Sequence, residues 1–231
     1  DAQPTDERFK TGYGIAAVMH CVSNRGYDPR FDKATVLLST QPDGSIEINS
    51  GEIEIGAGTV EILMAHVARE LSVDRSLLQV MLGNTITGPY GLGSFASRTS
   101  FFAGCAVIDA CVQFKTACGE LAAEFGLDEG LSVTQIINNA RQKGWNGTLE
   151  VSGHYESTGV VVPDEFGYGN ISPAYTFSVH GCCVRVDKMT GQVSVQQYWA
   201  AHDSGVIVNP AGAIGQVIGG VTQGLGFALS E

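Results

Sequence analysis

The chain has 231 residues, of which 44% are hydrophobic, 16% are charged and 30 are glycine. This composition is typical of a folded, loop-rich chain that is long enough to bury a sizeable core. The formal net charge is −11 and no block of lysine or arginine is present, which argues against a nucleic-acid or membrane surface as the main function.

The first quarter of the chain shows strand character. Residues 12–22 and 34–40 predict strands, and the turn signal at 42–44 is followed by the alternating segment 45–49, which predicts the return strand of a hairpin. Residues 52–55 (EIEI) alternate again before glycines break the pattern.

A helical period begins at Thr59. Apolar residues fall at helical spacing at Val60, Leu63, Met64, Val67 and Leu71. A strand is predicted over 77–82, a loop over 84–93, and a long helix over about 100–125. The apolar face of that helix holds Phe102, Ala106, Val107, Ala110, Cys111, Phe114 and Ala117.

The second half of the chain is mostly strand. A short helix is predicted over 132–143, and strands are predicted over 149–155, 176–187 and 193–203. Met189-Thr190-Gly191 predicts the turn of a hairpin, and Asn209-Pro210 starts a helix rich in small residues. Because strands and helices do not alternate regularly, the pattern predicts an α+β fold with mixed or antiparallel sheets and packed helices.

The cysteines predict reduced thiols in a cytosolic protein. The chain has six, no CxxC pair is present, and Cys105, Cys111 and Cys118 share one apolar helical stretch. No signal peptide and no uninterrupted apolar run of about 18 residues is visible in the sequence. These features predict a cytoplasmic location without membrane contact.

Glycine-rich segments lead into helices at three places: residues 54–62, 91–102 and 209–220. The first turn of a helix has unpaired N–H groups, and glycine lets a ligand approach them, so such a segment can bind phosphate. In the second segment Thr99 or Ser100 can cap the helix, Ser97 offers a hydroxyl group and Arg98 adds a positive charge. Ordinary capping and tight packing are the alternative explanation. None of the three matches a nucleotide P-loop.

Several polar residues leave alternatives open. Gln216 lies in an apolar helix, either at the surface or, if buried, against a ligand that pairs its amide. His202-Asp203 could serve acid–base chemistry, but Asp203 fits a backbone turn before Gly205. His20, His66, His154 and His180 have no metal-ligand spacing and are interpreted as structural.

Four segments together resemble the molybdenum-binding large subunit of the xanthine dehydrogenase / aldehyde oxidase family of molybdenum hydroxylases. They are residues 51–85, 88–107 with its Phe-Ala-Ser-Arg sequence, the hairpin 172–195, and 200–229 with its Asp-x-Gly, Asn-Pro and Gly-Gln elements. The resemblance covers nearly all of residues 12–231. It implies that residues 1–231 are part of a molybdopterin-binding domain, with lobes of about 1–130 and 131–231.

The resemblance implies a molybdopterin cofactor with molybdenum, in bacteria often a cytosine dinucleotide. Gly56, Ala57 and Gly58 would form the first contact loop. Ala96 would lie near the metal and substrate, Ser97, Arg98 and Thr99 would hold polar groups of the cofactor, and Gln216 would bind at the molybdenum centre or pterin. The partners would be a small-molecule substrate and iron–sulfur and FAD subunits or domains.

Two departures from the family bear on activity. The family usually has glutamine where this chain has Ala57, and its general-base glutamate lies beyond Glu231. No catalytic residue and no protein metal ligand is therefore assigned, and the isolated chain is expected to be an inactive fragment or subunit. The implied reaction is hydroxylation of a purine-like N-heterocycle or an aldehyde. An aryl-CoA reductase of the same family and a degenerate, non-catalytic domain are the alternatives.

Overall fold

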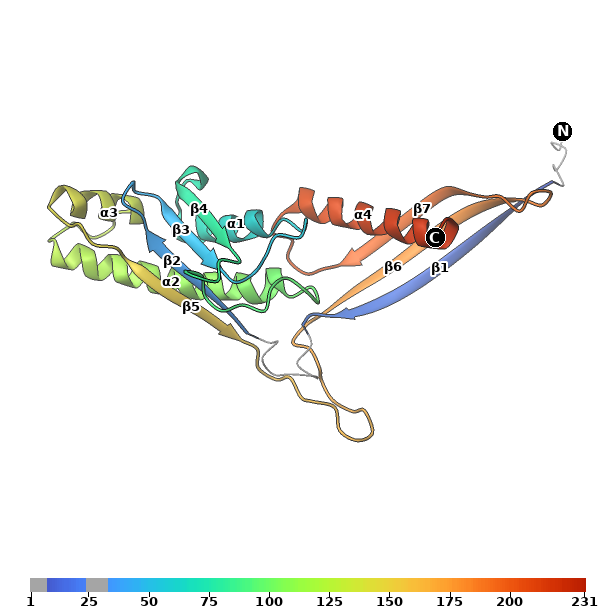
Figure 1. Ribbon diagram of the computed structural model, residues 1–231, viewed down its shortest axis with the longest axis horizontal. Helices are drawn as coiled ribbons and strands as arrows, with labels where there is room; N and C mark the ends of the chain where they lie inside the picture. Colours follow the sequence, from blue (N-terminus) through green and yellow to red (C-terminus); the bar gives the residue numbers. More distant parts are fainter. Residues whose placement is uncertain (1–7, 24–32) are drawn as a thin grey trace. The chain divides into compact units, whose positions relative to one another are not determined.

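The computed structural model describes residues 8–23 and 33–231, and their helices and strands fall into two units (Figure 1). The larger unit is Cys21–Ala174. The smaller unit combines Asp1–His20 with Tyr175–Glu231. The predicted lobe boundary near residue 130 falls inside the larger unit, between its second and third helices.

A four-stranded mixed sheet forms the base of the larger unit. Its strands are β2 (Lys33–Thr40), β3 (Ile46–Ser50), β4 (Leu78–Leu82) and β5 (Glu150–Glu156), in the order β4-β3-β2-β5. β2 pairs antiparallel with β3 and β5, while β3 pairs parallel with β4. The predicted hairpin of β2 and β3 is therefore confirmed.

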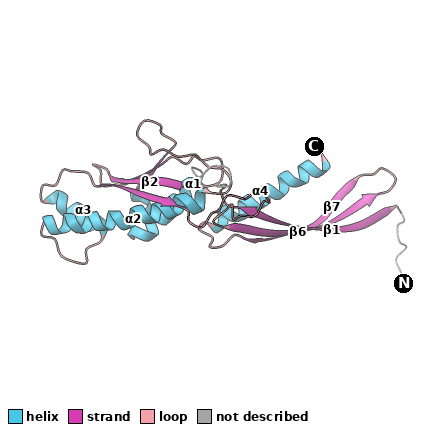
Figure 2. Ribbon diagram, turned by 90° about the horizontal axis from the view of Figure 1, so that it is seen from below, coloured by secondary structure: helices cyan, strands magenta, loops and turns pink. Residues whose placement is uncertain are grey.

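Three helices cover one face of this sheet (Figure 2). They are α1 (Thr59–Leu71), α2 (Thr99–Glu124) and α3 (Val133–Gln142), with a short 3₁₀ helix at Arg75–Leu77 before β4. Alternate residues of β2 are buried against them, so the face that carries Val36 and Leu38 forms the core with α1 and α2. The predicted apolar face of α2 is buried except for Ala117, which is half-buried.

Helix α2 is the central core helix of the larger unit. By length and composition it could cross a membrane, but half of its most apolar stretch is buried inside the protein, as expected for a core helix. Gly153 allows β5 to pack closely against α2, because a Cβ at this position would collide with the carbonyl oxygen of Ala106 on that helix. All six cysteines are free, and burial raises the pKa of Cys111 to about 12 and that of Cys118 to about 11.

The smaller unit has a three-stranded sheet and one helix. The sheet has the order β1-β6-β7, formed by β1 (Phe9–Cys21), β6 (Tyr175–Asp187) and β7 (Val193–Asp203). β6 and β7 form the predicted antiparallel hairpin, with a register shift after Cys183. Helix α4 (Pro210–Leu229) follows and has no buried residue.

Apolar side chains of the smaller unit are largely exposed. Among the described residues of this unit, Cys183 is the single buried apolar residue. The exposed ones include Tyr13, Ile15, Val18, Met19, Phe177, Val179, Trp199, Ile214, Ile218 and Phe227. Extended apolar surface of this kind is typical of an interface.

Candidate functional site

Two of the three glycine-rich segments meet in the larger unit. The loop of residues 51–58 leads from β3 to α1, and the loop of residues 93–99 leads into α2. Ser94 joins them, because its hydroxyl group donates to the carbonyl oxygen of Ile53 at 2.7 Å and accepts from the Ile53 N–H at 3.2 Å. The fold thus holds the two loops that carry predicted cofactor residues against each other.

A buried ion pair fixes the two loops to each other. The Arg98 Nη1 atom lies 2.6 Å from Glu52 Oε1, and the two side chains are 0% and 2% exposed. The other oxygen of Glu52 accepts from the Thr99 hydroxyl group at 3.1 Å and lies 3.2 Å from the Ser94 hydroxyl oxygen, whose single proton it shares with the Ile53 carbonyl oxygen. Arg98 also donates to the carbonyl oxygens of Gly93 and Lys33, which ties the second loop to the start of β2.

Two aromatic rings also flank this pair. The rings of Phe95 and Phe102 lie over the Arg98 guanidinium, with centroids 5.5 Å and 5.2 Å away. Burial raises the pKa of Glu52, and the charge of Arg98 together with the hydrogen bonds from Thr99 and Ser94 acts in the opposite direction. The carboxylate therefore depends on Arg98 for its charge to be tolerated.

These contacts differ from the role that the resemblance implied for Arg98 and Thr99. The resemblance implies that both residues hold polar groups of a cofactor. Instead, the Arg98 side chain has no exposed surface, and the Thr99 hydroxyl group donates to Glu52. That Arg98 and Thr99 hold the cofactor stays a prediction, and the structure shows that the Arg98 side chain holds the second loop in place.

Residues 52–55 do not form the strand that their alternation indicated. Instead, each of the two glutamates in this segment makes contacts at the start of a different helix. Glu52 pairs with Arg98, and Glu54 turns to α1, where its Oε1 accepts from the N–H groups of Gly56 at 2.8 Å and Gly58 at 3.0 Å. Its other oxygen accepts from the Val60 N–H at 3.4 Å.

The first turn of α1 therefore already has an anion bound to it. Burial acts to raise the pKa of Glu54, but the hydrogen bonds from Gly58, Val60 and Gly56 outweigh it, so the pKa lies below its ordinary value. The carboxylate occupies the N–H groups that the sequence offered for a phosphate. Space remains beside the loop, because a Cβ at Gly56 or Gly58 would meet no atom within 4 Å.

The start of α2 has a different character. Its cap residue is Arg98, which makes no side-chain hydrogen bond to the first turn, so the prediction that Thr99 or Ser100 caps this helix is wrong. The residues before it, Ala96 and Ser97, both have left-handed backbones, with φ of 46° and 54°. Consecutive non-glycine residues in this region are strained and are found at functional sites. Ser97 is exposed beside the helix end.

Two glycines hold the loop before α2 against β3. A Cβ on Gly51 would lie 2.5 Å from the Cα and N atoms of Gly91, and a Cβ on Gly91 would meet Gly51 as closely. The two backbones therefore touch, and a side chain at either position would separate them. This contact fixes residues 84–93, which lead to the strained residues 96 and 97.

The third glycine-rich segment lies in the smaller unit. Asn209 caps α4, because its side-chain oxygen accepts from the Gly212 N–H at 3.0 Å, and Pro210 is the first helical residue, as predicted. Gln216 is exposed on this helix, so the argument that burial forces its amide to find a ligand does not hold. That Gln216 binds at the molybdenum centre or the pterin stays a prediction.

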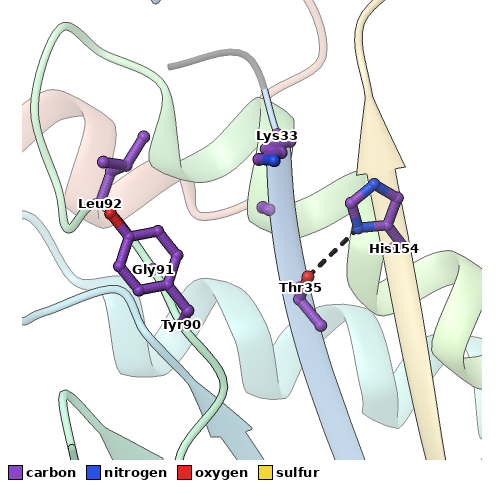
Figure 3. A pocket seen from close by; sticks show the side chains of 7 residues that line it. Lys33, Thr35, Tyr90, Gly91, Leu92 and His154 are labelled. Carbon is purple, nitrogen blue, oxygen red and sulfur yellow. Dashed lines mark hydrogen bonds between the residues drawn. The ribbon is translucent and has the colours of Figure 1, made fainter. Parts of the chain in front are cut away.

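A cavity of about 190 Å³ opens elsewhere on the larger unit (Figure 3). It is lined by Lys33, Ala34 and Thr35 of β2, His154 of β5 and residues 90–92 of the loop before α2. Figure 3 shows the Thr35 hydroxyl group bonded to the His154 ring, with Oγ1 and Nδ1 3.2 Å apart. None of the predicted cofactor residues lines this cavity, so we do not assign it to the candidate cofactor site.

The sequence matches the family of the molybdopterin cofactor-binding domain over residues 1–231. The chain belongs to this family. The resemblance to the molybdenum-binding large subunits and the predicted α+β fold are both confirmed.

Curated relatives of this molybdopterin-binding domain are oxidoreductases. The chain is 27% identical over 210 residues to the carbon monoxide dehydrogenase large chain of Hydrogenophaga pseudoflava. This alignment covers 87% of this chain and 26% of that protein. It is 28% identical over 234 residues to the aldehyde oxidoreductase molybdenum-binding subunit PaoC of Escherichia coli O157:H7, covering 99% and 30%. The chain thus spans between a quarter and a third of the length of these relatives.

The fold is shared with solved structures. The aldehyde oxidoreductase from Desulfovibrio desulfuricans matches 96% of this chain with a TM-score of 0.79 at 19% identity, and the match covers 23% of that protein. At this identity the likeness concerns the fold alone.

Proposed function

We propose that this molybdopterin-binding domain forms part of the cofactor site of a molybdenum hydroxylase and that the start of α2 binds a phosphate group of the cofactor. The observation that carries this is the contrast between the helix starts. The side chains of Glu54 and Asn209 accept N–H groups of the first turns of α1 and α4, whereas the side chain of Arg98, the cap residue of α2, bonds to Glu52, Gly93 and Lys33 and does not cap the first turn. A phosphate at α2 meets the positive end of a helix beside an exposed hydroxyl group, that of Ser97.

The residues of the two loops fit such a ligand in different ways. Ala96 and Ser97 present their backbone at the start of α2, where their strained conformation is kept by the buried Arg98–Glu52 pair. Gly56 and Gly58 leave open space beside the first loop, where part of the cofactor could approach the backbone. Arg98 acts as a positioning residue in this arrangement.

The chemistry that the cofactor supplies when bound is molybdenum-dependent hydroxylation of an electron-poor carbon. We assign this chain to the binding and orientation of that cofactor, for a substrate that is an N-heterocycle or an aldehyde. Electrons would pass to iron–sulfur clusters and FAD on other domains or chains. The exposed apolar side chains of β1, β6, β7 and α4 offer surface for such neighbours.

Cofactor content and a matched pair of variants at Ser97 test the proposal. Asn and Asp both tolerate a left-handed backbone, so Ser97→Asn and Ser97→Asp differ mainly in charge. The added carboxylate of Ser97→Asp should repel the phosphate while stabilising α2 by about 0.3–1 kcal/mol. We expect near-stoichiometric molybdenum and pterin in the purified wild-type protein and in Ser97→Asn, and a clear loss in Ser97→Asp with an unchanged or higher melting temperature.

Two outcomes would contradict the proposal. A folded wild-type protein without molybdenum and pterin, made in a host that synthesises the cofactor, would favour a degenerate domain, which the replacement of glutamine by Ala57 would explain. Equal cofactor content in Ser97→Asp and Ser97→Asn would mean that the phosphate lies elsewhere. The Ala57→Gln variant separates these two outcomes. It should raise the molybdenum and pterin content if the wild-type domain is degenerate because it lacks this glutamine.

A further inference from the structure

The β6–β7 hairpin brings together three polar aromatic side chains. His180 pairs with Ala200 and His202 pairs with Ser178 across the two strands, so the two histidines lie diagonally on one face of the sheet. Their Nε2 atoms are 2.8 Å apart, and the Nδ1 atom of His180 is 2.8 Å from the hydroxyl group of Tyr198. His202 is exposed, and His180 and Tyr198 are half-buried.

The facing Nε2 atoms constrain the two rings. One Nε2 must donate and the other must accept, so the pair shares a single proton along this line. A cation placed between the rings would replace that proton and meet a lone pair from each. Two nitrogen ligands of a tetrahedral Zn²⁺, each about 2.0–2.1 Å from the metal, lie about 3.3 Å apart. The observed separation is within a small ring rotation of that value.

Tyr198 completes the arrangement expected around a metal-binding histidine. When Nε2 of such a histidine binds a metal, its Nδ1–H is usually held by an acceptor that fixes the ring. The Tyr198 oxygen lies at this position next to His180. The described residues contain no cluster of three or more histidine, cysteine or acidic ligands, so water would complete the coordination.

We propose that His180 and His202 form a binding site for a first-row dication that prefers imidazole, Zn²⁺ or Cu²⁺, with Tyr198 orienting His180. Binding moves the shared Nε2 proton to the Nδ1 atom of the same ring, so that both neutral imidazoles offer an Nε2 lone pair to the metal, and it involves no change of oxidation state. Sequence spacing could not indicate the site, because the two histidines are 22 residues apart and only the hairpin register brings them together.

Zn²⁺ titration of the purified protein by calorimetry tests the site. We expect one equivalent to bind in the wild type and the affinity to fall by roughly tenfold or more in His180→Gln and in His202→Gln. Tyr198→Phe should weaken binding by about 10–100-fold, as loss of an orienting partner does. His154→Gln is the matched control, since this histidine bonds to Thr35 away from the hairpin, and it should bind Zn²⁺ like the wild type.

A second measurement needs no variant. Cu²⁺ added to the wild-type protein should give an electron paramagnetic resonance spectrum with coupling to two imidazole nitrogens. A spectrum without this coupling, or equal Zn²⁺ affinity in the wild type and in the folded His180→Gln/His202→Gln double variant, would overturn the proposal.

Discussion

The loops that lead into α1 and α2 look alike in sequence but differ in how they treat the helix end. The loop before α1 places the Glu54 carboxylate on the first turn, where it accepts three N–H groups. The loop before α2 holds Glu52 inside the protein, where it pairs with Arg98. Arg98 is the cap residue of α2, and its side chain does not bond to the first turn. The difference teaches that two glycine-rich helix starts of similar sequence can place their glutamates differently, one on the N–H groups of the first turn and one in a buried ion pair.

The largest expected effect comes from removing the buried ion pair at the start of α2. Arg98→Ala leaves Glu52 buried without its counter-charge, so the free energy of unfolding should fall by about 3–5 kcal/mol. Urea unfolding followed by circular dichroism measures it. The exposed pair of Arg69 and Glu70 is the control, and Arg69→Ala should cost at most about 1 kcal/mol.

A double variant shows whether the charge or the volume of the pair matters. Replacing both members with apolar residues in Glu52→Leu/Arg98→Met should cost clearly less than Arg98→Ala alone, because no buried charge is left unpaired. If the double variant were as unstable as Arg98→Ala, the ion pair would not be the reason for the loss.

A smaller effect is expected where the loop before α2 touches β3. Gly51→Ala places a Cβ 2.5 Å from the backbone of Gly91, which must move away, at a cost of about 1–3 kcal/mol. Thermal unfolding of the variant measures the change. Gly119→Ala, on α2 with no atom within 4 Å of the new Cβ, should instead stabilise the protein slightly. A neutral Gly51→Ala would contradict the close backbone contact.

The smallest effect concerns the α1 side. Glu54→Gln removes the charge on the first turn and should lower stability by about 0.3–1 kcal/mol at neutral pH. The pKa of Glu54 is lower in the folded protein than in the unfolded chain, so its contribution is present above the ordinary carboxyl range and is lost as the pH falls through the lowered pKa.

Stability measured from neutral to acid pH checks this. The wild type and Glu54→Gln should differ at neutral pH and converge as the pH falls. Glu124→Gln, at the opposite end of a helix, should not lower stability, because a negative charge near a helix C-terminus is unfavourable. A constant gap between the wild type and Glu54→Gln at all pH values would show that the carboxylate does not act through its charge.

The elements of the fold could be predicted because their signals are local. The period of α1, the long apolar face of α2 and the turn of the β6–β7 hairpin each lie within one stretch of sequence. The error at residues 52–55 has a physical reason: alternating glutamates look like a half-buried strand, but each found a partner at a helix start.

The contacts within the candidate site could not be predicted from sequence. Family motifs pointed to the loops around Gly56 and Ala96, whereas the partners of Arg98 are 5, 46 and 65 residues away along the chain. Such pairings follow from the tertiary fold. The same is true of His180 and His202, and of Gln216, whose exposure on α4 could not be read from its apolar neighbours.

The left-handed backbone at Ala96 and Ser97 limits which side chains these positions accept. Glycine, asparagine and aspartate fit such a backbone, whereas valine, isoleucine and threonine would clash with it. Attempts to redesign the loop before α2 by random mutagenesis should therefore recover a narrow set of small or amide-bearing replacements at both positions, and larger changes of shape will have to come from Phe95 or from the first loop.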